Sequence, residues 1–382
     1  MSPDVPKTTG QSSTGIATVQ ACPMNDLPNE LLAFIFLCFL QASSSYPESL
    51  EEGTKSRKRF VDSLDHTFSS KILLTHVCAR WRTIITHSPT LWQTLHFDAS
   101  FYWTFQSDCN KIARSLTRHL QLSSDLPLHV RLTGWPCSFF SSLVPFWRLS
   151  NPINVGMHFK NLIDSAKRWE TLTMMDSHIH VLRVLRLLPT SFPKLKHLVI
   201  EHDGSSPVEV EGSVTIAIGL EVRQFLETFS MPVLESIRFD GLPKFSELVP
   251  MPPLTVEGAV AKLTRLEIAH PADVPYVLYF LRSAVNLKSL KLELSSLDVP
   301  ISSDNLVAPI RLDHLEHVDV SLSSNSPSIY QFIKAIVGRL SLSRLEKFFV
   351  RTPPIGSPEE REQMTRLERH FLQIGVPVTM SV

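Results

Sequence analysis

A short pattern of apolar residues recurs seven times from residue 169 onward, and it limits the folds open to this chain more than any other feature. Each copy has apolar residues at its first, fourth and sixth positions, which is typical of a half-buried strand. The copies are Trp169-Leu172-Met174, Leu195-Leu198-Ile200, Leu234-Ile237-Phe239, Leu263-Leu266-Ile268, Leu287-Leu290-Leu292, Leu315-Val318-Val320 and Leu345-Phe348-Val350. Successive starts differ by 26, 39, 29, 24, 28 and 30 residues. Each unit has too little apolar surface to fold alone and gains stability by stacking on its neighbours.

Helical stretches lie between several of these strands. They are Val181 to Leu188, Val222 to Phe229, Val274 to Ala284 and Ser328 to Leu340. Strand and helix at this period resemble leucine-rich repeats, which are about 20 to 29 residues long. The repeats are irregular, because most lack the asparagine that usually follows the strand and an insertion around Asp203 to Val214 lengthens one of them. The alternative is a non-repetitive α/β domain, since any alternating strand and helix can contain Leu-x-x-Leu.

Further elements extend the pattern at both ends. Trp92 to Phe97 and Pro127 to Leu132 alternate as strands do, and Lys111 to Leu122 between them predicts a helix. A C-terminal helix is predicted to begin at Ser357 and to end near Gly375. Its apolar face comprises Met364, Leu367 and Phe371. This helix is expected to cover the last repeat, because the ends of a repeat array must be capped.

The N-terminal part contains a helix without a polar face. Pro28 and Glu30 are typical of a first helical turn, and every residue from Leu31 to Leu40 is apolar. A helix that is apolar all round must be buried all round. Ten residues are too few for a membrane span, which needs about 20. One side is therefore expected to pack on its own domain, and the other to need a partner.

A second N-terminal helix is predicted from about Ser70 to Thr86. Its apolar stripe comprises Leu74, Val77, Cys78, Trp81, Ile84 and Ile85. Arg80 and Arg82 lie off the stripe, and Ser88-Pro89 ends the helix because proline cannot continue its hydrogen bonds. Leu91 and Trp92 follow as a further apolar anchor.

These two segments together resemble the F-box, a three-helix module that docks on the Skp adaptor of cullin-RING ubiquitin ligases. The match is carried by Leu27-Pro28, Glu30-Leu31-Leu32, Ile35-Phe36, Val77-Cys78, Trp81-Arg82, Ile84-Ile85 and Pro89-Thr90-Leu91-Trp92. A polar insert at about 42–69 departs from the usual F-box, and it is similar to inserts in the large F-box families of mushroom-forming fungi. The alternative is an ordinary N-terminal helical cap with Trp81 and Trp92 as core residues, although it accounts poorly for the whole ordered set.

The fold expected from both resemblances is α/β, with an N-terminal three-helix F-box followed by an irregular leucine-rich-repeat-like α/β solenoid. Its parts are a disordered N-terminus (1–20), an F-box-like domain (21–98), a transition with strand and helix (99–168) and the solenoid with its C-terminal capping helix (169–382). Residues 1–20 are expected to be disordered because they are polar and rich in Ser, Thr and Gly.

The F-box resemblance implies a substrate receptor that binds a Skp-type adaptor and, through it, a cullin-RING ligase. The residues implied to line or shape the adaptor-facing surface are Leu27, Pro28, Glu30, Leu31, Leu32, Ile35, Phe36, Val77, Cys78, Trp81, Ile84, Leu91 and Trp92. Catalysis in such a complex is proximity, so the chain supplies no nucleophile and needs no cofactor. The alternative from another class is a protein–protein interaction scaffold whose F-box-like helices pack only internally.

The target protein is expected on the concave strand face of the solenoid. The candidate target-binding residues there are Lys196, Arg238, Arg265, Lys288, Lys291, His317, Lys347 and Phe349, and His197, Glu267 and Asp319 share the face. Phe349 is the best candidate anchor, because aromatic residues dominate interface hot spots. The C-terminal helix is an alternative cover for Phe349.

Composition excludes several other classes of protein. The 37 basic and 37 acidic residues cancel, so no net field steers the chain to nucleic acid or to an anionic membrane. Five cysteines without a C-x-x-C pair disfavour a disulfide framework and a structural zinc site. Without a sequon or a secretory signal pattern, the expected location is the cytoplasm, the nucleus or both. Lys55 to Arg59 is interpreted as a charged loop, with a nuclear signal as the alternative.

Motifs for chemistry are absent from the sequence. It contains no G-x-S-x-G, no phosphate-binding G-x-x-x-x-G-K-S/T, no G-x-G-x-x-G and no H-E-x-x-H. His178 and His180 are the closest pair to a metal site, but no third ligand is near in sequence, so solvent-exposed or capping roles are favoured. An enzyme with unrecognised motifs remains a third hypothesis, which would require a deep pocket with convergent polar groups.

Overall fold

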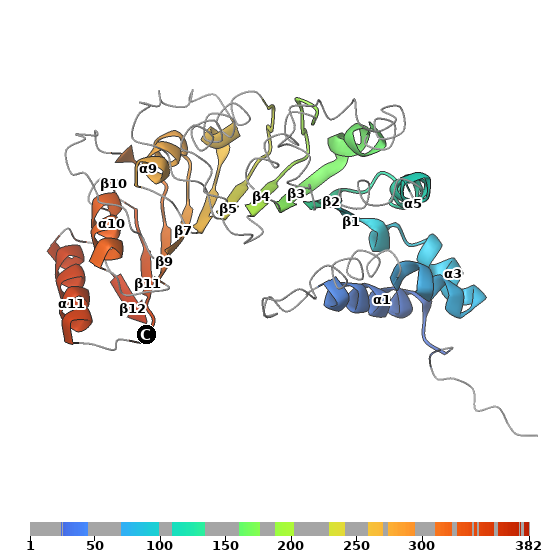
Figure 1. The fold of residues 1–382 in the computed structure, drawn as a ribbon, viewed down its shortest axis with the longest axis horizontal. Helices are drawn as coiled ribbons and strands as arrows, with labels where there is room; N and C mark the ends of the chain where they lie inside the picture. The colour runs from blue at the N-terminus through green and yellow to red at the C-terminus, as the bar shows by residue number, and fades with distance from the viewer. Residues whose placement is uncertain are drawn as a thin grey trace, which may run out of the picture.

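The structure is a computed structural model (Figure 1). It describes residues 24, 26–44, 70–98, 109–133, 160–175, 188–201, 229–240, 259–269, 274–294, 310–322, 327–337, 340–341, 344–354, 358–373, 375 and 378–381. Several predictions fall on residues outside these ranges. They concern residues 1–20, the insert from 45 to 69 with its basic run, most of the helices at 181–188 and 222–229, the insertion at 203–214, and the pair His178 and His180.

Three helices and a 3₁₀ turn form the N-terminal part of the described chain. α1 (Asn29–Ser44) begins directly after Pro28, whose carbonyl oxygen accepts a hydrogen bond from the Leu32 N–H. A helix at 70–77 is followed by α3 (Ala79–Thr86) and by the 3₁₀ helix η2 (Pro89–Trp92).

The prediction of one continuous helix from Ser70 to Thr86 is wrong. The chain is extended at Cys78, and the Cys78 sulfur accepts a hydrogen bond from the Trp81 N–H at 3.4 Å. Cys78 therefore acts as the N-cap of α3 and satisfies one of its first free N–H groups. The sequence pattern did not reveal this break, because the apolar stripe keeps its helical spacing on both sides of it.

The N-terminal helices share a small core of their own. Its buried residues are Leu32, Phe36, Leu40, Ile84, Ile85, Leu91 and Trp92. The rings of Phe36 and Trp81 lie 4.7 Å apart between centroids, and the Trp92 indole N–H donates to the Ile85 carbonyl at 2.8 Å. Trp92 lies in η2, so the strand predicted from Trp92 begins two residues later.

Ten parallel strands form one curved sheet in which neighbours follow chain order (Figure 1). They are β1 (Thr94–Asp98), β2 (Leu128–Thr133), β3 (Trp169–Met175), β4 (His197–Glu201), β5 (Ser236–Asp240), β6 (Arg265–Ala269), β7 (Ser289–Leu294), β9 (His317–Leu322), β11 (Lys347–Arg351) and β12 (Val378–Ser381). All seven predicted repeat strands are present, from β3 to β11. β12 and a separate two-stranded pair, β8 (Ile310–Arg311) with β10 (Leu340–Ser341), were not predicted.

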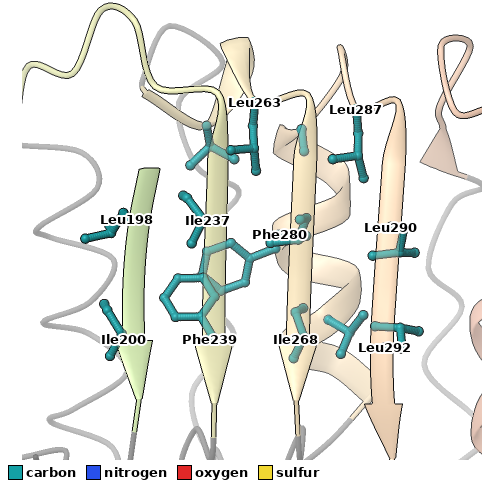
Figure 2. Close-up of a cluster of buried hydrophobic side chains, with 14 of the residues drawn as sticks. Leu198, Ile200, Ile237, Phe239, Leu263, Ile268, Phe280, Leu287, Leu290 and Leu292 are labelled. Carbon is teal, nitrogen blue, oxygen red and sulfur yellow. The ribbon is translucent and has the colours of Figure 1, made fainter. Parts of the chain in front are cut away.

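The register of the sheet aligns the repeated apolar positions in continuous rows. The fourth positions of successive units lie opposite one another: Leu172, Leu198, Ile237, Leu266, Leu290, Val318 and Phe348. The sixth positions, which include Ile200, Phe239 and Ile268, form a second row beside the first. Both rows are buried in one large hydrophobic cluster (Figure 2).

Helices cover the outer side of the curved sheet, and the strands line its inner side (Figure 1). The outer elements are α5 (Cys109–Leu122), η6 (Ser165–Arg168), η7 (Ala259–Lys262), α9 (Val274–Ser283), α10 (Pro327–Val337) and α11 (Pro358–Gln373). Phe280 of α9 packs on Phe239 of β5 with 5.0 Å between ring centroids, and Phe371 of α11 packs on Phe348 of β11 at 4.7 Å. The α/β class predicted from the sequence is confirmed.

We expect Phe280→Ala to destabilise the protein strongly, because it removes a ring that is 1% exposed and leaves a cavity against Phe239. The expected loss in free energy of unfolding is about 3 to 5 kcal/mol. Urea denaturation measures it. Phe349→Ala removes the same ring from an exposed position and is the matched control, with an expected loss below about 1 kcal/mol. Equal losses in the two variants would show that α9 is not packed on the sheet as described.

Candidate protein-docking surfaces

One face of α1 is apolar and exposed. Leu32, Phe36 and Leu40 follow one another at intervals of four residues and are buried in the N-terminal core. On the opposite side of the helix, Phe34 is 62% exposed and Ile35 is 40% exposed. The expectation that one side packs on its own domain is thus confirmed, and the other side is exposed; that it needs a partner stays a prediction. We call Leu31, Phe34, Ile35, Cys38 and Phe39 the α1 face; all five are exposed.

Arg80 of α3 holds the start of α1 in place. Its guanidinium donates two hydrogen bonds to the Asn29 side-chain oxygen, at 3.1 and 2.9 Å, and another to the Leu27 carbonyl. These bonds position the Leu27-Pro28 turn next to the α1 face. Sequence reasoning placed Arg80 off the apolar stripe and gave it no role, because a contact between residues 51 positions apart leaves no local signal.

The residues predicted to bind an adaptor divide by burial into two groups. Exposed or partly exposed are Leu27, Pro28, Glu30, Leu31, Ile35, Val77, Cys78 and Trp81, and buried are Leu32, Phe36, Ile84, Leu91 and Trp92. The first group can touch a partner. The second group can act only through the shape of the core that supports the first.

Several exposed apolar residues were missed by the sequence prediction. They are Phe34 and Phe39 on α1, and Ile72 and Leu73 on the helix at 70–77. The signal for the first two was present in the sequence: in a run of ten apolar residues, those opposite the buried positions have no core to enter. Leu73 lies one turn before Val77, and both are more than half exposed, so that helix also presents apolar side chains to solvent.

A buried polar cluster joins the N-terminal helices to the sheet. Lys71 is 2% exposed; its ammonium nitrogen donates to the Thr94 carbonyl of β1 at 3.1 Å and lies 5.3 Å from the centroid of the Trp92 ring. The His119 imidazole of α5 meets the same ring in an edge-on arrangement and donates from Nε2 to the Trp92 carbonyl at 2.6 Å. The helix at 70–77, η2, β1 and α5 therefore meet here through direct hydrogen bonds and ring contacts.

Burial governs the charges in this cluster. It lowers the pKa of Lys71 from 10.5 to about 7. Burial, together with the charge of Lys71, also holds the pKa of His119 well below its ordinary value, although hydrogen bonds to backbone groups oppose the shift. The cluster is therefore most stable with an uncharged imidazole and with an uncharged Lys71 amine.

No protein-family model and no curated protein matches this chain. Its function is therefore inferred from the chemistry of two surfaces, the α1 face and the inner face of the sheet.

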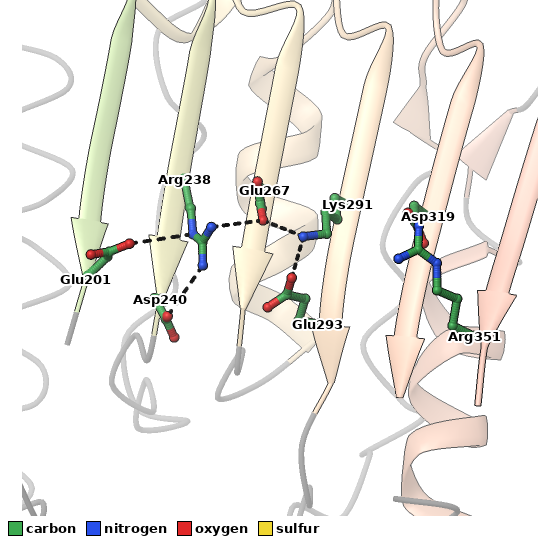
Figure 3. Close-up of polar contacts among 8 residues, drawn as sticks. All are labelled: Glu201, Arg238, Asp240, Glu267, Lys291, Glu293, Asp319 and Arg351. Atoms are coloured by element: carbon green, nitrogen blue, oxygen red, sulfur yellow. Dashed lines mark hydrogen bonds and ion pairs between the residues drawn. The ribbon is translucent and has the colours of Figure 1, made fainter. Parts of the chain in front are cut away.

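Ion pairs cross the inner face of the sheet from strand to strand (Figure 3). Glu267 on β6 accepts from Lys291 on β7 at 2.7 Å and lies 3.4 Å from Arg238 on β5. Lys291 also pairs with Glu293, and Arg238 lies 3.8 Å from Asp240 and 4.0 Å from Glu201. Burial lowers the pKa of Lys291, but its hydrogen bonds to Glu267 and Glu293 raise it by more, so the pKa is raised overall. We call these six residues the ion-pair ladder.

Imidazole–hydroxyl pairs occupy the first half of the inner face. His96 is hydrogen-bonded to Thr133 at 3.0 Å, His129 to Thr171 at 3.0 Å and His197 to Ser236 at 2.7 Å. Each pair joins neighbouring strands. Burial and the nearby charge of Arg131 lower the pKa of His96 to about 4, so His96 is neutral at pH 7.

The structure places the predicted target-binding residues in three settings. Arg238 and Lys291 belong to the ion-pair ladder; Arg265, His317, Lys347 and Phe349 lie on the inner face outside it; Lys196 and Lys288 lie in the turns just before β4 and β7. Lys196 pairs with Glu170 at 2.7 Å, and this hydrogen bond lowers the pKa of Glu170. Phe349 is 38% exposed and is not covered by α11, which packs on the opposite face of β11.

The ranges that the structure describes also bear on metal binding and on membrane insertion. Within those ranges, no group of three or more His, Cys, Asp or Glu side chains is arranged to hold a metal ion. No helix among the described segments is long and apolar enough to cross a membrane.

The buried amine predicts how stability depends on pH. Between about pH 7 and pH 10.5, the unfolded chain keeps a proton on Lys71 that the folded chain has lost. Stability is therefore expected to rise with pH across this window, by up to about 1.4 kcal/mol per pH unit from this group. Below pH 7 both states are protonated and the cost of burying the charge is fully present.

Urea unfolding at a series of pH values measures this slope. Lys71→Met is expected to lack the Lys71 part of the rise above pH 7, whereas Lys262→Met, which changes an exposed lysine, keeps the wild-type curve. Parallel curves for Lys71→Met and the wild type would show that the Lys71 amine is not buried as described.

Proposed function

We propose that this protein is the substrate-recognition subunit of a Skp-cullin-F-box ubiquitin ligase. In this proposal α1, the helix at 70–77 and α3 are the F-box, and the ten-stranded sheet with its outer helices is an irregular leucine-rich-repeat-like solenoid. The α1 face binds the Skp-type adaptor, and the inner face of the sheet holds a target protein. The complex belongs in the cytoplasm or the nucleus, and it requires neither nucleic acid nor a membrane.

The observation that carries the proposal is the apolar, exposed α1 face beside the Leu27-Pro28 turn. Large apolar side chains at this density on a short helical module mark an interaction site on a protein surface. Complete burial of a Leu, Ile or Phe side chain contributes about 1.5 to 3 kcal/mol. The Leu, Ile and Phe side chains of the α1 face are each about half exposed, so a partner can bury the exposed half. Four such residues, Leu31, Phe34, Ile35 and Phe39, therefore supply enough apolar surface for a stable contact.

The fold supports the solenoid part of the proposal. Parallel strands follow one another in chain order with their apolar positions aligned, and helices return along the outer side. This arrangement is what stacked repeats produce, because each unit contacts only its neighbours. It also leaves a long polar inner face, along which an extended target segment can lie.

The mechanism assigned to the chain is positioning. The α1 face binds the adaptor while the inner face binds the target, and the buried cluster of Lys71, Trp92 and His119 fixes the helices against β1 and α5. A fixed spacing between the two surfaces raises the effective concentration of the target near a ubiquitin-loaded enzyme that other subunits recruit. The residues of this chain then bind and orient, and the transfer chemistry takes place elsewhere in the complex.

Isothermal titration calorimetry with a purified Skp-type adaptor tests the proposal. The wild-type chain is expected to bind, and Ile35→Asp is expected to bind at least about tenfold more weakly, since it places a charge in the apolar contact. Circular dichroism checks that the variant still folds, which is expected because Ile35 is 40% exposed.

Leu372→Asp is the matched control. Leu372 of α11 is an aliphatic residue that is 67% exposed and lies at the other end of the fold, so the same substitution there should leave adaptor binding unchanged. A well-folded wild-type chain that binds no Skp-type adaptor would refute the ligase role. The remaining hypothesis would then be an interaction scaffold whose N-terminal helices serve the fold alone.

A further inference from the structure

Charges on the inner face are balanced on the central strands. Each of β5, β6 and β7 carries one cation and one acid there: Arg238 and Asp240, Arg265 and Glu267, and Lys291 and Glu293. Five of these six side chains belong to the ion-pair ladder. These strands therefore present little net charge by which a partner could be selected.

β11 departs from this balance. Its three inner-face side chains are Lys347, Phe349 and Arg351, which we call the β11 strip; it contains two cations and no acid. The register places Phe349 opposite Asp319 of β9 and opposite Thr379 of β12. Asp319 pairs with Arg351 at 2.6 Å, and the Arg351 side chain is still 60% exposed (Figure 3).

Lys347 adds positive charge that no described residue of the inner face neutralises. It is exposed, and its register partner on β9 is His317. Among the residues that the structure describes, none forms an ion pair with Lys347. Glu346 precedes β11, so it is not one of the strip's side chains. Two cations thus face one carboxylate, which leaves net positive charge around an aromatic ring.

Phe349 supplies an apolar contact at the centre of the strip. The neighbouring Phe348 points into the core, where Phe371 covers it, whereas Phe349 remains 38% exposed on the inner face. An exposed aromatic ring between cations suits a segment that carries an apolar side chain flanked by carboxylates. The ring would bury the apolar group, and the arginine would bind a carboxylate with two parallel hydrogen bonds.

We propose that the β11 strip binds a short extended acidic segment of a partner protein, in which an apolar residue contacts Phe349 and neighbouring carboxylates contact Lys347 and Arg351. The inference rests on the proposed function in that the partner is the target of the receptor. It specifies the chemistry of that target and the part of the inner face that recognises it.

A displayed library of short random peptides, selected on the full-length chain, tests the inference. The enriched peptides are expected to carry Asp or Glu on both sides of an apolar residue. The double charge reversal Lys347→Glu with Arg351→Glu is expected to abolish this enrichment. For an enriched acidic peptide made by synthesis, Phe349→Ala is expected to weaken binding at least about tenfold in calorimetry.

The matched control reverses two exposed arginines on the outer side, Arg361→Glu with Arg369→Glu on α11, and it should select the same acidic peptides as the wild type. A library that enriches no acidic peptides, or acidic peptides that bind equally well after charge reversal of the strip, overturns the inference. The selection uses no adaptor, so adaptor binding by the same preparations reports separately on the ligase role.

Discussion

The structure depends on the alignment of apolar side chains between neighbouring parallel strands. Leu198, Ile237 and Leu266 lie opposite one another in successive strands, and none of them is buried by its own repeat alone. Because side chains alternate along a strand, the register that aligns the core also aligns the inner face. Arg238 therefore lies beside Glu267, and Glu267 beside Lys291. One geometric constraint thus produces the core on one face and the ion-pair ladder on the other.

Among the described residues, buried hydrogen bonds connect the N-terminal helices, which carry the α1 face, to the sheet, which carries the inner face. Lys71 reaches β1, and His119 of α5 reaches the Trp92 carbonyl, so the N-terminal core and the sheet share hydrogen bonds. Lys71 has no acidic partner among the described residues; burying its amine costs free energy, and the lowered pKa of Lys71 reflects that cost. A receptor that must hold a target at a set distance from its adaptor gains from a junction of this kind, because a flexible junction would dilute the effect of proximity.

Sequence reasoning found the elements whose signal is local. The Leu-x-x-Leu-x-Leu pattern located the seven repeat strands β3, β4, β5, β6, β7, β9 and β11, and the apolar run located α1. It failed where the signal comes from distant residues or from a single backbone angle: the extended conformation at Cys78, the burial of Lys71 and the addition of β12. Lys196 and Lys288 were assigned to the inner face, but in these two units the second position comes before the strand begins. Which charges neutralise one another depends on register, which the pattern of one strand does not reveal.

Protection of Cys38 tests the central claim most directly, because its thiol belongs to the α1 face and is exposed. The rate at which a thiol reagent modifies Cys38 can be followed by peptide mass spectrometry, with and without a Skp-type adaptor. A Leu372→Cys variant adds a reference thiol at a distant exposed site on α11. The account predicts that the adaptor slows modification of Cys38 strongly and leaves modification of the reference thiol unaffected. Modification of Cys38 at the same rate in the presence of saturating adaptor would contradict docking through this face.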